Sequence, residues 1–79
     1  NPVTQITYDI PEDSYISIRI YDLSGAYITS LMDEISQQGK HTVQWDGTDA
    51  NGKDMSSGVY FYRFDSNLIS MTKKMLLIR

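Results

Sequence analysis

The sequence feature that most constrains the fold is a strict alternation of apolar and polar residues over positions 15–21. Ile16, Ile18 and Ile20 are separated by Ser17 and Arg19 and flanked by tyrosines. A period of two is the spacing of a β-strand with one buried face, and β-branched side chains favour strands. The sequence therefore predicts a strand here that buries its isoleucine face.

Five further segments have the composition or alternation of strands. They are residues 6–10, 26 to about 32, 41–46, 59–64 and 69–78, and turn-forming residues separate them. Six or seven short strands joined by frequent turns predict an all-β fold. We expect an immunoglobulin-like antiparallel β-sandwich of about seven strands, forming a single domain over residues 1–79.

The third segment fits two interpretations. Ile28, Leu31, Met32 and Ile35 have helical spacing, whereas the run Tyr-Ile-Thr at 27–29 favours a strand. The stretch is short for a helix that must bury a full face. We therefore predict a strand to about Met32, followed by irregular chain to Gly39.

Composition limits the classes of function. The chain has 79 residues, no cysteine and a net charge of −3, which excludes disulfides, thiolate metal sites and cysteine nucleophiles. Residues 1–54 have nine acidic and three basic side chains, and residues 55–79 have one acidic and four basic. A mostly acidic domain is a poor candidate for binding nucleic acid. No apolar run is long enough to span a membrane.

Potential catalytic residues do not form a recognisable motif. His41 is the sole histidine, which excludes a multi-histidine metal site and favours a structural role. Ser56-Ser57-Gly58 resembles neither a nucleophile elbow nor a phosphate loop. We expect no enzymatic activity, no cofactor and no metal ion.

The loop from Asp46 to Asp54 is rich in carboxylates and invites a calcium hypothesis. Aligning Gly52 with the invariant glycine of an EF-hand places glycines at the first and twelfth ligand positions, so the motif fails. Turn formation is the favoured interpretation, because Asp and Asn cap their own backbone and Asn51-Gly52 is a strong turn signal. Weak calcium binding remains the alternative.

The aromatic residues also allow two interpretations. Five of them, Trp45, Tyr60, Phe61, Tyr62 and Phe64, have the character of a sugar-binding platform. A thin two-sheet core needs most of these rings for burial, however, and we favour that role.

Taken together, the motifs resemble the C-terminal sorting domains of proteins exported by the bacterial type IX secretion system. The resemblance is carried by Ile-Thr-Tyr-Asp-Ile-Pro-Glu at 6–12, Ile-Tyr-Asp-Leu-Ser-Gly at 20–25, Gly-Lys-His-Thr-Val-Gln-Trp-Asp at 39–46, Ser-Gly-Val-Tyr-Phe-Tyr-Arg at 57–63 and Lys-Met-Leu-Leu-Ile-Arg at 74–79. The segments 45–52 and 57–60 are also similar to the immunoglobulin-like domain of the flagellar hook-capping protein.

The sorting resemblance implies a non-catalytic signal domain that directs its parent protein through the periplasm to the cell surface or medium. The implied partners are an outer-membrane translocon, sortase-like processing machinery and parent cargo domains N-terminal to the chain. The abrupt start at Asn1-Pro2 fits a fragment of a larger exported protein.

The implied recognition signal is the terminal segment Lys73, Lys74, Met75, Leu76, Leu77, Ile78 and Arg79. Three residues are expected to have structural roles: Gly25 in a hairpin turn, Trp45 in the core and Gly58 at a sharp turn into the next strand. An exposed strand edge offers a surface for a weak dimer. The alternative function is a structural or adhesive immunoglobulin-like module of a secreted protein, with carbohydrate association as a further variant.

Overall fold

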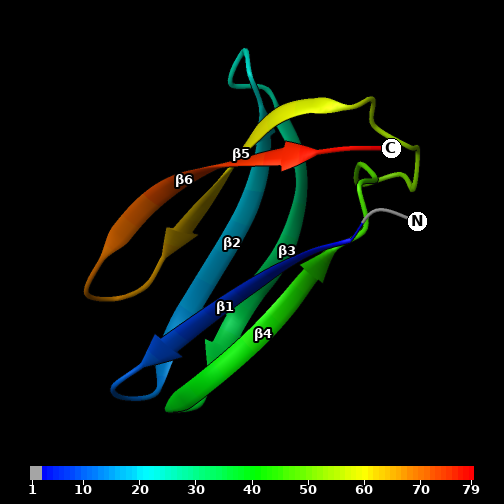
Figure 1. Ribbon diagram of the computed structural model, residues 1–79. Helices are drawn as coiled ribbons and strands as arrows, with labels where there is room; N and C mark the ends of the chain where they lie inside the picture. Colours follow the sequence, from blue (N-terminus) through cyan, green and yellow to red (C-terminus); the bar gives the residue numbers. More distant parts are fainter. Residues whose placement is uncertain (1–2) are drawn as a thin grey trace.

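The computed structural model describes residues 3–79 and contains six β-strands in that range (Figure 1). In chain order they are β1 (Thr4–Ile10), β2 (Ser14–Asp22), β3 (Tyr27–Ser36), β4 (Gly39–Trp45), β5 (Gly58–Asp65) and β6 (Ser70–Leu77). No helix among the described residues is long and apolar enough to cross a membrane.

The strands form two antiparallel sheets of unequal width. A four-stranded sheet has the order β3-β2-β5-β6, and β1 pairs with β4 in a two-stranded sheet. In Figure 1 the blue and green strands of the small sheet cross in front of the larger one. The predicted all-β sandwich is confirmed, with six strands in the described part of the chain. The predicted loop after Trp45 adds only an isolated bridge between Thr48 and Asp54.

The core lies between the two sheets and is centred on β2. Ile16, Ile18 and Ile20 have no solvent exposure, as their alternation predicts. Their neighbours in the core come from four other strands and from the end of β4: Ile6, Tyr8, Ile10, Ile28, Trp45, Tyr60, Phe64 and Leu77. Because the inner face of β2 is fully used for packing, residues 15, 17, 19 and 21 belong to the opposite face of the large sheet.

The third strand is longer than predicted. β3 continues to Ser36, and Asp33, Glu34 and Ile35 pair with the first half of β2. A register irregularity opposite Ile18 and Arg19 leaves Leu31 out of the pairing, and both Leu31 and Met32 pack against the core. A β-bulge therefore produces two adjacent core residues, and this is the origin of the helix-like spacing in the sequence.

The turn between β2 and β3 shows why residues 22–25 connect two strands. One carboxylate oxygen of Asp22 accepts hydrogen bonds from the backbone N–H groups of Ser24 and Ala26 and from the Ser24 hydroxyl. These bonds hold the pKa of Asp22 below its usual value, the Ser24 hydroxyl having the largest effect. Gly25 has a φ of 89°, a left-handed conformation that favours glycine.

Candidate functional surface

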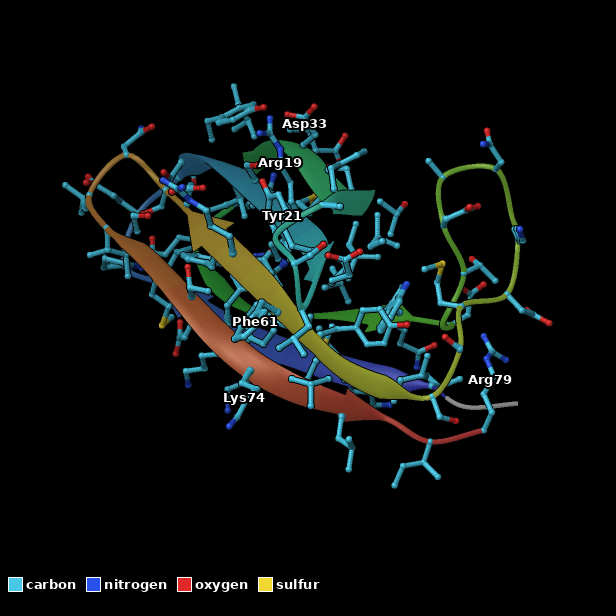
Figure 2. All side chains as sticks on the ribbon, turned by 90° about the horizontal axis from the view of Figure 1, so that it is seen from above. Arg19, Tyr21, Asp33, Phe61, Lys74 and Arg79 are labelled. Carbon is cyan, nitrogen blue, oxygen red and sulfur yellow. The ribbon has the colours of Figure 1, made fainter. Side chains whose placement is uncertain are left out.

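The outer face of the four-stranded sheet combines aromatic and basic side chains in aligned rows. The strand register places Arg19 opposite Arg63, and Arg63 opposite Thr72 on β6. In the next row, Tyr21 lies opposite Phe61, and Phe61 opposite Lys74. Figure 2 labels Tyr21, Phe61 and Lys74 along this face. The sheet therefore presents a continuous strip of exposed and half-buried side chains from β2 to β6.

A surface groove of about 320 Å³ lies over this strip. It is lined by Tyr21, Asp22, Leu23, Gly25, Phe61, Arg63 and Thr72. The sequence did not reveal the groove because it is built by the β2–β3 turn together with β2, β5 and β6, which are distant in sequence. The sequence could have indicated that Tyr21 and Phe61 lie on the outer faces of their two strands. It did not predict that these strands pair with each other.

The charges on this face are partly compensated. The Arg63 Nε lies 3.0 Å from a carboxylate oxygen of Asp65, and both side chains remain accessible to solvent. A hydrogen bond from the Ser70 hydroxyl and, secondarily, the Arg63 guanidinium hold the pKa of Asp65 below its usual value. The Asp65 carboxylate is thus engaged by both Ser70 and Arg63.

The suggested aromatic sugar platform is not formed. Trp45, Tyr60 and Phe64 are buried in the core, and the Trp45 and Tyr60 rings meet edge to face with centroids 5.1 Å apart. Phe61 and Tyr62 are half-buried and, as neighbours in β5, lie on opposite faces of the sheet. Four of the five rings therefore serve the core, as the sequence favoured for most of them, and Phe61 lies on the outer face.

The segment 73–79 is the second half of β6 and its continuation. Lys73 and Lys74 are exposed, Met75 is half-buried and Leu77 is part of the core. Leu76 and Ile78 are 59% and 68% exposed, so the side chains of this segment that point away from the core are open to solvent. β6 is the edge strand of its sheet, and its outer face has no covering layer among the described residues.

Arg79 binds the long loop that follows β4. Its guanidinium donates hydrogen bonds to the carbonyl oxygens of Gly47 and Met55 and lies 3.5 Å from a carboxylate oxygen of Asp54. A Cβ atom added to Gly47 would come within 2.6 Å of the Arg79 guanidinium. Glycine is favoured at position 47 by its φ of 80°, and a side chain there would also displace the Arg79 guanidinium. Gly58 begins β5 with a φ of 157° and has open space around it.

The carboxylates of the same loop are occupied by its own backbone. Asp46 accepts from the N–H and hydroxyl of Thr48, and Asp49 accepts from the N–H groups of Asn51 and Lys53. The Thr48 hydroxyl has the largest effect in holding the pKa of Asp46 below its usual value. Residues 3–79 contain no cluster of three potential metal-ligating side chains. The predicted turn chemistry is confirmed.

His41 is held by packing. Its ring stacks on Tyr8 with centroids 5.2 Å apart, and its Nε2 donates to the Gln37 carbonyl oxygen at 2.6 Å. The imidazole thus connects β4 to the turn that follows β3, and within residues 3–79 no carboxylate is hydrogen-bonded to it.

Comparison with known proteins identifies the relatives of this fold. The crystal structure of FlgD from P. aeruginosa matches with a TM-score of 0.73 and 20% identity, covering 95% of this chain and 59% of that chain. FlgD from Xanthomonas campestris, described as a hook-capping protein essential for flagellar assembly, matches with a TM-score of 0.72 and 23% identity, covering 96% and 56%. The chain thus spans less than two thirds of either protein. No curated protein sequence matches it.

These findings overturn the sorting interpretation. The family whose sequence model matches is the FlgD Ig-like domain, over residues 3–67, and none of the comparisons supports a type IX sorting domain. The predicted sorting function is therefore wrong, as are its translocon and sortase-like partners. The role of residues 73–79 in recognition was inferred from that function and is otherwise untested. The second resemblance, to the immunoglobulin-like domain of the flagellar hook-capping protein, is the one that the family model supports. The chain belongs to the FlgD Ig-like domain family.

Proposed function

We propose that this chain is a non-catalytic structural module of a flagellar hook-capping protein. The observation that carries the proposal is the match of the FlgD Ig-like family model to residues 3–67, supported by the likeness of the fold to two FlgD structures. A structural role also accounts for the way the polar side chains are used.

The hydrogen bonds of the described residues support this role. The carboxylates with lowered pKa values, at Asp22, Asp46 and Asp65, are all engaged by neighbouring hydroxyl or N–H groups within turns or across the β5–β6 pair. Catalytic groups are instead found with pKa values shifted toward their task inside a cleft. Here the ionisable groups stabilise local backbone, and the exposed sheet face offers area for protein contacts.

Hook assembly in the source organism provides the test. Removing the codons for residues 1–79 from the chromosomal gene should abolish or shorten flagellar hooks in electron micrographs and abolish swimming, and the intact gene should restore both. The control strain carries Tyr27→Ala, which changes an exposed aromatic residue and should leave hooks normal. Normal hooks in the deletion strain, or a genome that encodes no hook subunit, would refute the proposal. The proposal also includes export of the protein from the cytoplasm. This part is tested by looking for the protein in isolated hooks.

A further inference from the structure

The two edges of the four-stranded sheet are complementary to one another. β3 forms one edge and β6 the other, and within residues 3–79 each pairs with a single neighbouring strand. An antiparallel sheet with an even number of strands has edges that run in opposite directions. A second copy in the same orientation, placed beside β6, therefore brings its β3 alongside in antiparallel pairing, with the outer faces of the two sheets continuous.

The charges on the two edges have opposite sign. Asp33 and Glu34 are adjacent on β3, and Lys73 and Lys74 are adjacent on β6. All four residues are exposed, and the ion pairs of the described residues join other side chains, at Arg63–Asp65 and Arg79–Asp54. Figure 2 shows Asp33 and Lys74 at opposite sides of the molecule. They cannot meet within one copy.

The charged residues on the two edges match not only in the sign of their charge but also in the face of the sheet to which they belong. Asp33 pairs with Ser17 and Lys74 with Phe61, so both belong to the outer face. Glu34 pairs with the buried Ile16 and Lys73 with Tyr62, so both belong to the inner side. One antiparallel register sets Asp33 opposite Lys74 and Glu34 opposite Lys73 at the same time.

The same register joins apolar side chains. It places Met32 opposite Met75, and both of these methionines are half-buried and pack against the core of their own copy. Residues 32–36 of β3, which follow the bulge at Leu31, then face residues 71–75 of β6.

Symmetric pairing of like edges is disfavoured by the same charges. Two β6 edges would bring lysines together, and two β3 edges would bring carboxylates together, and like charges directly opposite destabilise a strand pair. Lysines on an edge strand commonly prevent such pairing. In this chain, pairing of β6 of one copy with β3 of the next brings opposite charges together, whereas pairing of like edges does not.

We propose that copies of this chain associate head to tail through β3 and β6, with Asp33 and Glu34 of one copy opposite Lys74 and Lys73 of the next. The contact is heterologous, so it builds rows or closed rings of copies rather than symmetric pairs. This inference goes beyond the hook-capping role and does not depend on it, because it rests on the edges of the sheet alone.

Charge reversal tests the pairing in solution. Sedimentation velocity of the 79-residue chain should show concentration-dependent association that weakens as salt rises from about 0.05 M to about 0.5 M, because salt screens exposed charges. The variants Asp33→Lys/Glu34→Lys and Lys73→Glu/Lys74→Glu should each associate at least about tenfold more weakly, since each sets like charges opposite. An equimolar mixture of the two variants, and the chain carrying all four changes, should recover the association.

A matched control reverses two lysines away from both edges. Lys40→Glu/Lys53→Glu makes the same change in net charge on β4 and in the long loop, and association should stay within about twofold of the original. A chain that remains monomeric up to about millimolar concentration overturns the proposal. Equal weakening by the control pair, or no recovery in the mixture, overturns it as well.

Cysteine cross-linking tests the register. The chain has no cysteine of its own, so Asp33→Cys/Lys74→Cys carries the sole two thiols. Within one copy these positions are three strand spacings apart, about 14 Å, which is too far for a disulfide. Mild oxidation should therefore give a ladder of covalent oligomers. The companion Asp33→Cys/Lys73→Cys loses the same charges but places its thiols on opposite faces, and it should give no ladder. A ladder from both variants, or from neither, contradicts the register.

Discussion

Replacing Trp45 tests whether the core is organised as described. The indole is 1% exposed, its ring meets Tyr60 edge to face, and its N–H donates to the Thr48 carbonyl oxygen at 2.9 Å. Trp45→Ala removes all three contributions, and removing a large buried aromatic side chain costs about 3–5 kcal/mol. Within this total, the hydrogen bond and the aromatic pair each contribute about 1 kcal/mol.

The free energy of unfolding sets the scale of the effect. A chain of this length has a free energy of unfolding of about 4–12 kcal/mol, so the alanine variant should lose about a quarter of it or more. With an m-value of about 1 kcal/mol/M, the urea midpoint should fall by about 3–5 M. Trp45→Phe keeps a ring in the core and loses the N–H donor, so its free energy of unfolding should fall by about 1–2 kcal/mol.

Far-UV circular dichroism during urea titration is the appropriate assay, because the variants lack the sole tryptophan fluorophore. Tyr27→Ala is the matched control: it removes an aromatic ring that is 53% exposed and should change stability by less than about 1 kcal/mol. The reasoning fails if Trp45→Ala and Tyr27→Ala have the same midpoint. It also fails if Trp45→Phe is as unstable as Trp45→Ala, since the ring would then contribute nothing.

Two further predictions concern the turns. Gly47→Ala should lower the urea midpoint more than Gly25→Ala, because both glycines have positive φ but the Cβ at position 47 would also collide with the Arg79 guanidinium; equal midpoints would contradict the close approach. The pKa of Asp46 is lowered mainly by the Thr48 hydroxyl, so its folded-state contribution is complete above the unfolded value of 3.8 and is lost as pH falls through the lower folded value. Urea midpoints measured from about pH 6 to about pH 2 should therefore fall less steeply for Asp46→Asn than for the unchanged chain, and parallel curves would rule out this carboxylate as a contributor.

The predictable part of the fold is the part governed by local alternation. Ile16, Ile18 and Ile20 identified the central strand because one face of β2 is fully buried. The end of β3 could not be predicted in this way. Asp33 and Glu34 are exposed edge residues with no alternating signal, and the bulge at Leu31 changes the phase of the pattern. Irregularities of register are set by long-range pairing, which a local pattern does not contain.

The functional surface was less predictable than the fold. The strip of Tyr21 and Phe61 depends on a pairing between residues forty positions apart, and the charge match between Asp33 and Lys74 depends on the order of all four strands. The sequence shows which types of residue are present, but it does not show which of them become neighbours in the folded sheet. The error of function has a related cause: motifs such as Asp22–Gly25 and Trp45 specify turns and core, so they report the shared architecture more strongly than the biological role.

The pairing of β2 with β5 has a consequence for the order of folding. The hairpins β2–β3 and β5–β6 are local and can close quickly, but they are joined by a contact such as Ser17 with Asp65, across 48 positions of chain. Closing a long loop costs entropy before the new contacts compensate for it, so folds dominated by such contacts are slow. We therefore expect docking of the two preformed hairpins to limit the folding rate. During synthesis, the β2–β3 hairpin is made first, and the other edge of β2 stays unpaired until β5 has been synthesised.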